Sequence, residues 1–275
     1  MQFACTDYIF YKIKICTGNI LNKHDNNKSS HTRPIIFVAG ATGAVGFKLC
    51  LILKQHDYQV YGTTRSINKA CFLEAIGVVP VIVDVLNKNQ LINEIKTISP
   101  QIIIHQLTDL PYGLNPEHMR EARKRNAKIR ETGTTHLIEA AQSISCQKFI
   151  AQSIAFAHEP SASRINDDSP LAISSDNEII KNNALNISDM ESRIRQSQLN
   201  HVILRYGKLY GPATGCNKAS GGSIHVDVAA HAAYLAIDKG SGTYLIVEED
   251  QTYSSEKAKI ELDLDTFYRW KIQHI

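Results

Sequence analysis

The sequence predicts an α/β protein built on a doubly wound parallel sheet. Short, continuous apolar runs alternate with segments of helical periodicity along residues 34–247. Such runs are typical of parallel strands that are buried on both faces, whereas half-exposed strands alternate polar and apolar residues. A glycine-rich turn also follows the first run, where a strand would pass into a helix. These observations favour one sheet of about seven parallel strands with helices on both faces.

The expected elements alternate strictly between strands and helices. The strands are expected at residues 35–39, 59–63, 79–83, 101–105, 148–152, 202–206 and 243–247. The helices are expected at about 45–53 and at 67–76, 91–98, 117–144, 178–198 and 225–238. In the helical segments apolar residues recur every three or four positions, which places them on one face.

Charge and cysteine content narrow the classes of partner and compartment. The net charge of the chain is +3, and residues 1–33 alone carry a surplus of +3 (five basic minus two acidic residues), so the remainder is balanced. No apolar run approaches the ~18 to 20 residues of a membrane span. The six cysteines form no Cys-x-x-Cys pair, which favours reduced, buried thiols over disulfides. We expect a cytoplasmic protein with a small-molecule substrate and no nucleic-acid or membrane partner, and leave a homodimer open.

The glycine-rich turn has the spacing of a dinucleotide-binding turn. Gly40, Gly43 and Gly46 follow the first apolar run in a Gly-x-x-Gly-x-x-Gly pattern. The first glycine allows a sharp turn, the second lets the backbone approach a pyrophosphate, and the third permits close helix packing. The phosphates would bind the free N–H groups at the helix N-terminus. A tight turn without a ligand uses the same residue type, so the spacing alone leaves both readings open.

Further candidates follow the ends of the next strands, where ligands of open parallel sheets bind. Arg65, in the segment Thr63-Thr64-Arg65-Ser66, suits a 2′-phosphate and favours NADP over NAD, unless it is a solvated residue at a helix start. Asp84 and Val85 could bind an adenine ring, unless Asp84 only caps the next helix. Leu107 and Thr108 would lie along the cofactor. Ser153 could meet a substrate oxygen, unless it is a buried serine that bonds to the backbone.

Six segments carry a resemblance to a known family. They are GATGAVG at 40–46, VDV at 83–85, GTTHLIEAA at 133–141, FIAQSIAF at 149–156, LRYGKLYGP at 204–212 and IHVDVAA at 224–230. Together they span about residues 34–247 in one order. This ordered set resembles the extended short-chain dehydrogenase/reductases, the NAD-dependent epimerase/dehydratase group.

The resemblance implies a Rossmann fold of about seven strands, with NAD(P) across the carboxyl ends and substrate over the nicotinamide. It implies a phosphate loop of Gly40, Thr42, Gly43, Ala44, Val45 and Gly46, ribose-phosphate contacts from Thr64 and Arg65, adenine contacts from Asp84 and Val85, and contacts along the cofactor from Leu107 and Thr108. Tyr206 and Gly207 would lie on the nicotinamide side, and Ser153 would match the active-site serine or threonine.

The sequence departs from this family at the proton donor and at the substrate lobe. Relatives carry Tyr-x-x-x-Lys on the helix before the sixth strand, but Asn183 and Ile187 align with those positions and segment 170–200 has no tyrosine. His158 or Asp189 could substitute, unless each is a solvated surface residue. The substrate elements, about 157–177 and 207–224, are short. We therefore expect a reduced C-terminal substrate lobe.

The predicted organisation is a disordered extension at 1–33, an NAD(P)-binding domain at 34–250 and a short tail at 251–275. Two functions fit. The first is an oxidoreductase or epimerase-like enzyme that transfers hydride to or from a carbonyl, alcohol or nucleotide-sugar substrate with a non-standard proton donor. The second is a catalytically silent NAD(P)-binding sensor or partner module. The glycine turn supports both, the retained serine favours the first, and the missing tyrosine and lysine favour the second.

Overall fold

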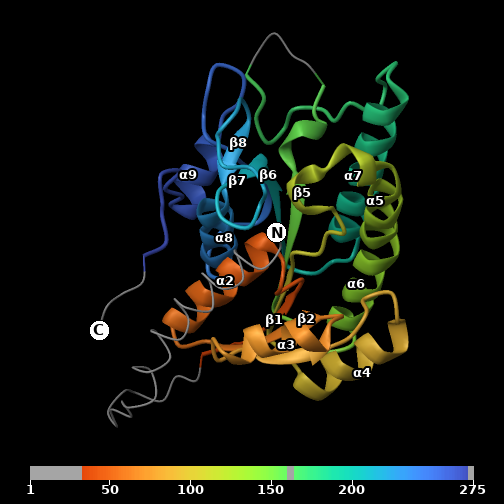
Figure 1. The fold of residues 1–275 in the computed structure, drawn as a ribbon, viewed down its shortest axis with the longest axis vertical. Helices are drawn as coiled ribbons and strands as arrows, with labels where there is room; N and C mark the ends of the chain where they lie inside the picture. The colour runs from red at the N-terminus through yellow and green to blue at the C-terminus, as the bar shows by residue number, and fades with distance from the viewer. Residues whose placement is uncertain (1–32, 160–163, 272–275) are drawn as a thin grey trace.

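A seven-stranded parallel sheet forms the centre of the molecule in a computed structural model that describes residues 33–159 and 164–271 (Figure 1). The strand order is β3-β2-β1-β4-β5-β6-β9, and every neighbouring pair is parallel. The strands are β1 (Ile35–Ala39), β2 (Gln59–Thr64), β3 (Val79–Ile82), β4 (Ile102–His105), β5 (Lys148–Ile154), β6 (His201–Tyr206) and β9 (Gly242–Ile246). All seven predicted strands are confirmed to within two residues at each end, and so is the α/β fold class.

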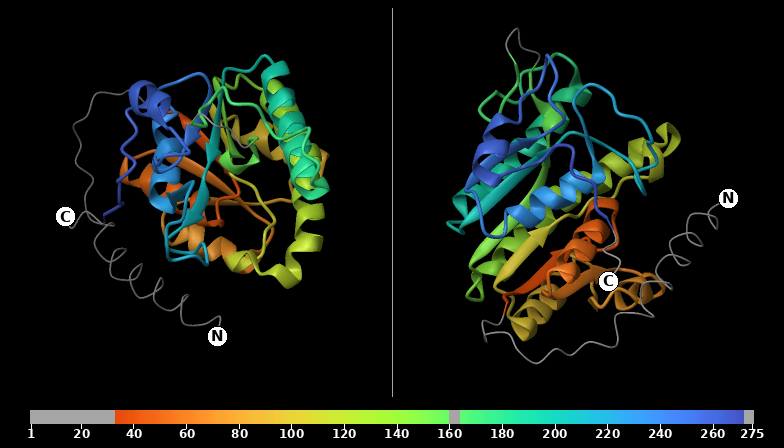
Figure 2. Two further views of the ribbon diagram at one scale, coloured as in Figure 1. Left: turned by 90° about the horizontal axis from the view of Figure 1, so that it is seen from above. Right: turned by 90° about the vertical axis from the view of Figure 1, so that its left-hand side faces the viewer.

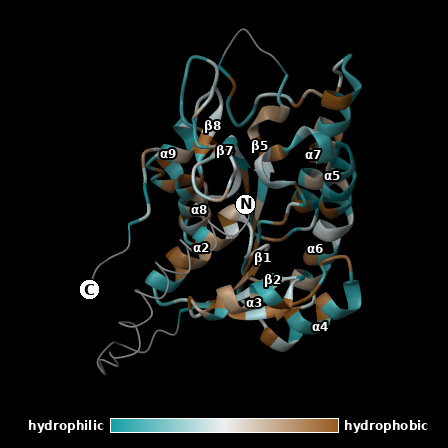
Figure 3. Cartoon of the chain, viewed as in Figure 1, coloured by the Kyte–Doolittle hydropathy of each residue, from teal (hydrophilic) through white to brown (hydrophobic). Residues whose placement is uncertain are grey.

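Helices cover both faces of this sheet. They are α2 (Ala44–Gln55), α3 (Ile67–Glu74), α4 (Lys88–Ile98), α5 (Pro116–Lys128), α6 (Thr134–Gln142), α7 (Glu178–Gln196), α8 (Val226–Leu235) and α9 (Glu256–Leu262). One apolar core forms where α2, α3, α8 and α9 pack on the sheet. A second core lies on the opposite face, beneath α4, α6 and α7. Figure 2 shows these two helical layers from above, and Figure 3 shows that much of α5 is hydrophilic.

The helix predicted at 117–144 is interrupted in the structure. Between α5 and α6 the chain forms a π turn, η2 (Ile129–Gly133). Gly133 lies in this turn, and a Cβ there would come within 3.1 Å of a Val85 methyl group. The turn therefore packs closely against the segment after β3, which the helical periodicity of the sequence does not reveal.

Short elements near the C-terminus were not expected from the sequence. Strands β7 (Lys208–Tyr210) and β8 (Ser223–His225) form a separate two-stranded parallel sheet, and α9 lies within the predicted tail. The tail also returns to the main body: Trp270 donates from its backbone to Asp227 Oδ2 (3.1 Å) and from its ring to Gln55 Oε1 (3.0 Å). The end of the described tail is thus attached to α2 and α8.

Three predictions from the sequence concern the cysteines, the N-terminal extension and membrane-spanning segments. Cys50, Cys71, Cys146 and Cys216 are free. The expectation of buried thiols is correct for Cys50 and wrong for Cys71 and Cys216, which are exposed. The predicted disordered extension lies outside the described residues apart from Arg33. In the ranges that the structure describes, no helix has the length and apolarity to cross a membrane.

Candidate active site

A continuous cleft of about 3070 Å³ runs along the carboxyl ends of the strands. It brings together nearly all residues that the sequence nominated, from the glycine turn after β1 to Tyr206 at the end of β6 and Gly207 directly after it. The predicted residues that line it are Gly40, Thr42, Gly43, Ala44, Val45, Thr64, Arg65, Asp84, Val85, Leu107, Thr108, Ser153, Tyr206 and Gly207. Gly46 does not line the cleft and is buried beneath it. The cleft is therefore the candidate site.

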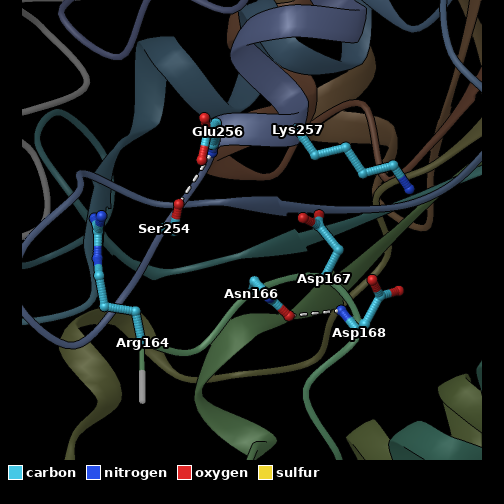
Figure 4. Close-up of a pocket in the computed structure, with 7 residues that line it drawn as sticks. All are labelled: Arg164, Asn166, Asp167, Asp168, Ser254, Glu256 and Lys257. Carbon is cyan, nitrogen blue, oxygen red and sulfur yellow. Dashed lines mark hydrogen bonds between the residues drawn. The ribbon is translucent and has the colours of Figure 1, made fainter.

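A smaller cavity of about 450 Å³ lies beside the edge strand β9 (Figure 4). Its side chains serve the backbone of neighbouring segments. Asp167 accepts from the Leu245 N–H of β9, Arg164 donates to the Tyr253 carbonyl (2.7 Å) and Lys257 donates to the Thr243 carbonyl (2.9 Å). Leu245 and Thr243 belong to the edge strand β9, so two of these bonds satisfy edge-strand groups that would otherwise lack partners. The cavity therefore has a structural role.

The glycine turn leaves open space toward the cleft at one position only. A Cβ on Gly46 would overlap the Gly40 carbonyl and lie 2.9 Å from its carbon, and a Cβ on Gly40 (φ 89°) would lie 2.6 Å from the Gln106 carbonyl oxygen. Both glycines are thus required by the protein's own packing. A Cβ on Gly43 would meet only the Gly40 oxygen, at an ordinary 3.4 Å. Since nothing described in the protein demands glycine at 43, the space there fits a ligand that approaches the backbone closely.

The N-terminus of α2 offers donors to such a ligand. Gly43 is its N-cap residue, has no side chain to cap the helix, and the first turn contains no acidic residue. The first backbone N–H groups of a helix have no intrahelical acceptor, and the helix dipole favours an anion beside them. The pyrophosphate of a dinucleotide therefore fits this end of the cleft.

The residues expected to contact the ribose and the adenine follow β2 and β3, and each has a partner within the protein. Arg65 pairs with Asp109 (3.4 Å), which also pairs with Arg125 (3.4 Å). Arg65 is exposed but has this partner, so it is not simply solvated. Asp84 Oδ1 accepts from the Leu86 N–H (2.9 Å), whereas Asn87 is the N-cap residue of α4. The alternative that Asp84 caps the next helix is therefore wrong.

His105 ends β4 and is held as a neutral, structural residue. Burial lowers its pKa to about 4. Its Nδ1 accepts from the Leu107 N–H (3.2 Å), so the remaining proton is on Nε2, which donates to Thr134 Oγ1 (3.0 Å). The imidazole joins β4 to α6 and fixes the start of the loop that carries Leu107 and Thr108.

Gln106 and Tyr206 form a polar pair in the middle of the cleft. Gln106 Nε2 donates to the Tyr206 hydroxyl (3.2 Å), and Gln106 Oε1 is buried without a partner among the described residues. Buried polar atoms normally find a partner, so this oxygen fits a donor on a bound ligand, such as a carboxamide. Burial also raises the pKa of Tyr206, which keeps the phenol protonated at neutral pH.

Ser153 donates its hydroxyl proton to a buried carboxylate, which neither sequence reading anticipated. Ser153 Oγ lies 2.7 Å from Glu191 Oε1. Arg205 binds both oxygens of Glu191 (2.9 and 2.7 Å), and Arg195 adds a further contact (2.6 Å). Burial by itself would raise the pKa of Glu191, but the hydrogen bonds and charge of Arg205, with Ser153 and Arg195, lower it. Since Glu191 is ionised, Ser153 is left as a hydrogen-bond acceptor toward the cleft.

His158 and Asp189 do not supply a proton donor to the cleft. His158 is buried, so the expectation of a surface residue is wrong for it; Asp189 is exposed as expected. His158 Nδ1 donates to the Ser169 carbonyl (2.8 Å) and Nε2 accepts from Arg205 (3.4 Å). Burial and the Arg205 charge lower the pKa of His158. Neither residue lines the cleft.

Asn183 lines the cleft at the aligned tyrosine position, while Ile187 at the aligned lysine position is wholly buried in the core. Asn183 Oδ1 accepts from Arg130 Nη1 of η2 (2.8 Å), and Arg130 lines the cleft as well. Sequence reasoning missed Arg130. The available signal was a polar row, Asn126, Arg130 and Thr134, at four-residue spacing along the predicted helix.

Comparisons with known proteins place this cleft in context. A 3-diazoavenalumate denitrifying reductase from a Streptomyces species is 29% identical over 237 residues, 78% of this chain and 76% of that protein. The UDP-glucuronic acid 4-epimerase of Bacillus cereus, solved with UDP-glucuronic acid and NAD, superposes with a TM-score of 0.66 at 16% identity and covers 86% of this chain and 95% of that chain. The Thermus thermophilus UDP-glucose 4-epimerase, solved with NAD, gives 0.63 at 18% identity over 78% of each chain.

The two solved structures show that the fold is shared. The family model "NAD dependent epimerase/dehydratase family" matches residues 36–232 of this chain, which is most of its length. The resemblance carried by the sequence motifs is thereby confirmed, and an NAD-binding, oxidoreductase- or epimerase-like function is supported with it. The chain belongs to the NAD-dependent epimerase/dehydratase family.

Proposed function

We propose that this protein transfers hydride between an NAD(P) cofactor in the cleft and a small molecule bound beside Ser153. The observation that carries the proposal is the open space at Gly43, which no packing contact among the described residues explains. It opens into the same cleft that Gln106 and Ser153 line. A dinucleotide that extends from the glycine turn toward Tyr206 would use each of these features.

The protein's residues would bind and orient the cofactor, which supplies the hydride chemistry when bound. The α2 amides would hold the pyrophosphate, and Asp84 would accept from the adenine amino group. Gln106 Oε1 would accept from a donor on the nicotinamide side. Arg65 favours NADP over NAD, with Asp109 as its present counter-ion.

One relative supports reduction as the direction of the reaction. The Streptomyces relative is named as a reductase, and the substrate elements between β6 and α8 are short. Ser153 would accept a hydrogen bond from a hydroxyl or amine of the substrate, because its own proton points to Glu191. Carbonyl, alcohol and nucleotide-sugar compounds remain the substrate classes to test. A cytoplasmic location and a homodimer remain predictions from the sequence.

A catalytically silent NAD(P)-binding protein is the second candidate. The observation that favours it is the loss of the family's Tyr-x-x-x-Lys pair from α7. Asn183 replaces the tyrosine, Ile187 is buried, and the nearby His158 is fully engaged outside the cleft. A positioned general acid or base contributes ~10² to 10⁴ in rate. A protein without one can still bind and sense the cofactor.

Two measurements on the full-length chain separate these functions. NADPH and NADH are first titrated by the change in cofactor fluorescence. Oxidation of the bound cofactor is then followed with carbonyl compounds, nucleotide sugars and an aromatic diazo compound. The enzyme proposal predicts binding and turnover, with turnover reduced and cofactor affinity unchanged in Ser153→Ala. Binding without turnover would favour the silent protein, and no binding at all would exclude both.

A further inference from the structure

Arg130 is a cleft residue whose charge has no counter-ion in the described part of the chain. Its one hydrogen bond goes to the neutral Asn183, and it forms no ion pair with any residue of 33–159 or 164–271. Burial lowers the pKa of Arg130 to about 10, with no contribution from a neighbouring carboxylate. The guanidinium therefore stays charged at neutral pH. A partly buried cation without a partner is costly unless an anion joins it.

The two polar neighbours of Arg130 on the same helix row bond to other parts of the fold. Asn126 accepts from the Asp109 N–H (3.1 Å), and Thr134 bonds to His105. Both ends of the polar row are thus used within the fold. Arg130 lies between them in the π turn η2 and reaches α7, which runs beside α5 in Figures 1 and 2. Single π turns inside helices are frequent at functional sites.

The free edge of this guanidinium suits a carboxylate. Asn183 occupies Nη1, which leaves the Nε and Nη2 hydrogens without a partner among the described residues. Two parallel N–H groups match the two oxygens of a carboxylate. The other arginines that are ion-paired at this cleft, Arg65 and Arg125, already share Asp109.

Exposed apolar side chains form part of the cleft wall toward α7, beside Asn183 and Asn186. Ile179, Ile180 and Phe156 line it and are 60%, 47% and 43% exposed. Ile154 and Met190 also face it. Large apolar side chains left exposed in a cleft indicate a ligand with apolar surface. A nucleotide sugar, which presents many hydroxyl and phosphate oxygens, matches such a wall less well than a hydrocarbon or aromatic group does.

We propose that Arg130 binds the carboxylate of an apolar organic acid, whose hydrocarbon or aromatic part lies against Phe156, Ile179 and Ile180. This proposal rests on the proposed function, because it names the substrate class of the same cleft. Arg130 is a specificity-determining residue in this arrangement. Asn183 is a positioning residue that fixes the guanidinium so that its free edge faces the ligand.

The test uses matched acid and amide probes on the full-length, NADPH-saturated protein, with affinities measured by calorimetry. Benzoate, cinnamate and octanoate are compared with their uncharged amides. We expect at least one acid to bind more tightly than its amide, and Arg130→Met to remove this preference. Charged hydrogen bonds of this strength correspond to roughly 10- to 150-fold in affinity. Arg130→Lys should retain part of the preference, because the charge remains and the two-pronged contact is lost.

Arg123→Met is the matched control, because Arg123 lies on α5, lines the same cleft and is exposed. It should leave the acid preference and NADPH affinity unchanged. Arg130→Met should also keep NADPH affinity and, without an acid, should melt at or above the temperature of the wild type, since it removes a partly buried charge that has no counter-ion among the described residues. The proposal is overturned if no acid outcompetes its amide, if the preference survives in Arg130→Met, or if that variant loses NADPH instead. Failure of both NADPH and NADH to bind the wild type would refute the proposed function separately, because the probes are also titrated without cofactor.

Discussion

Gly43→Ala should weaken cofactor binding and leave folding almost unchanged, whereas Gly46→Ala should destabilise the fold. The two positions are only about one helical turn apart. Gly43 is exposed in the cleft and has ordinary space for a Cβ, whereas Gly46 is buried and a Cβ there would overlap the Gly40 carbonyl. Gly43→Ala therefore obstructs only a ligand at the turn. Gly46→Ala forces the turn itself to move.

The expected sizes follow from these contacts. Overpacking costs about 1–3 kcal/mol, which applied to a bound pyrophosphate is a ~5- to 150-fold rise in the Kd of Gly43→Ala. Its loss of folding free energy should stay below about 1 kcal/mol, the cost of a poorer N-cap residue. Gly46→Ala gains about 1 kcal/mol of helix propensity, but the backbone overlap should outweigh it and lower the free energy of unfolding by about 1–3 kcal/mol.

Cofactor affinity is measured by fluorescence titration with NADH and NADPH, and stability by urea unfolding. Gly43→Val should weaken binding more than Gly43→Ala, because its methyl groups extend further into the cleft. Unchanged cofactor affinity in both Gly43 variants would show that the pyrophosphate does not lie at this turn. A Gly46→Ala protein as stable as the wild type would show that the turn relaxes more easily than its backbone contacts indicate.

Two further predictions concern ion pairs around the cleft. Glu191→Gln should lower the free energy of unfolding by about 3–5 kcal/mol in urea melts, because Arg205 would lose its buried counter-ion; a change below about 1 kcal/mol would contradict this. The folded pKa of Glu191 lies below its ordinary value of 4.5. Glu191 therefore stabilises the fold fully above pH 4.5, and this contribution is lost as the pH falls through the folded pKa. Glu191→Gln should not show this loss. Asp109→Asn should raise NADPH affinity relative to NADH, because Arg65 no longer has a competing carboxylate; an unchanged ratio in titrations would argue against a 2′-phosphate contact by Arg65.

Elements with a repeated local pattern were predictable, and elements held by single tertiary contacts were not. The strand β1 and the helix α2 behind the glycine turn follow from apolar runs and helical spacing, as do the other sheet strands. Strands β7 and β8 have three residues each, which is too short for a periodic signal. The helix α9 also escaped prediction, because the tail that contains it is polar and its packing depends on the sheet beneath.

At the candidate site, too, residues marked by a local pattern were predictable, and residues that depend on tertiary contacts were not. Gly40, Gly43 and Ser153 were nominated because each lies at or just after the carboxyl end of a strand, and these ends meet at one edge of a parallel sheet. The surface assignment of His158 failed because its burial depends on Arg205 and on the Ser169 carbonyl. Asp84 was open to interpretation as a helix cap because the sequence does not show that Asn87 is the residue whose side chain bonds to the first turn.

By itself, the sequence determined the parallel α/β fold, the family and the position of the glycine turn. These depend on spacings of two to four residues along the chain, and on the order of the motifs. Only the tertiary structure decided where the proton of Ser153 points and that Arg130 faces a neutral asparagine. Those contacts join residues 38 and 53 positions apart, so they exist only once α7 has packed beside β5 and η2. The chemistry at the reacting end of the cleft is therefore a property of how the helices pack, while the glycine turn is a property of the local sequence.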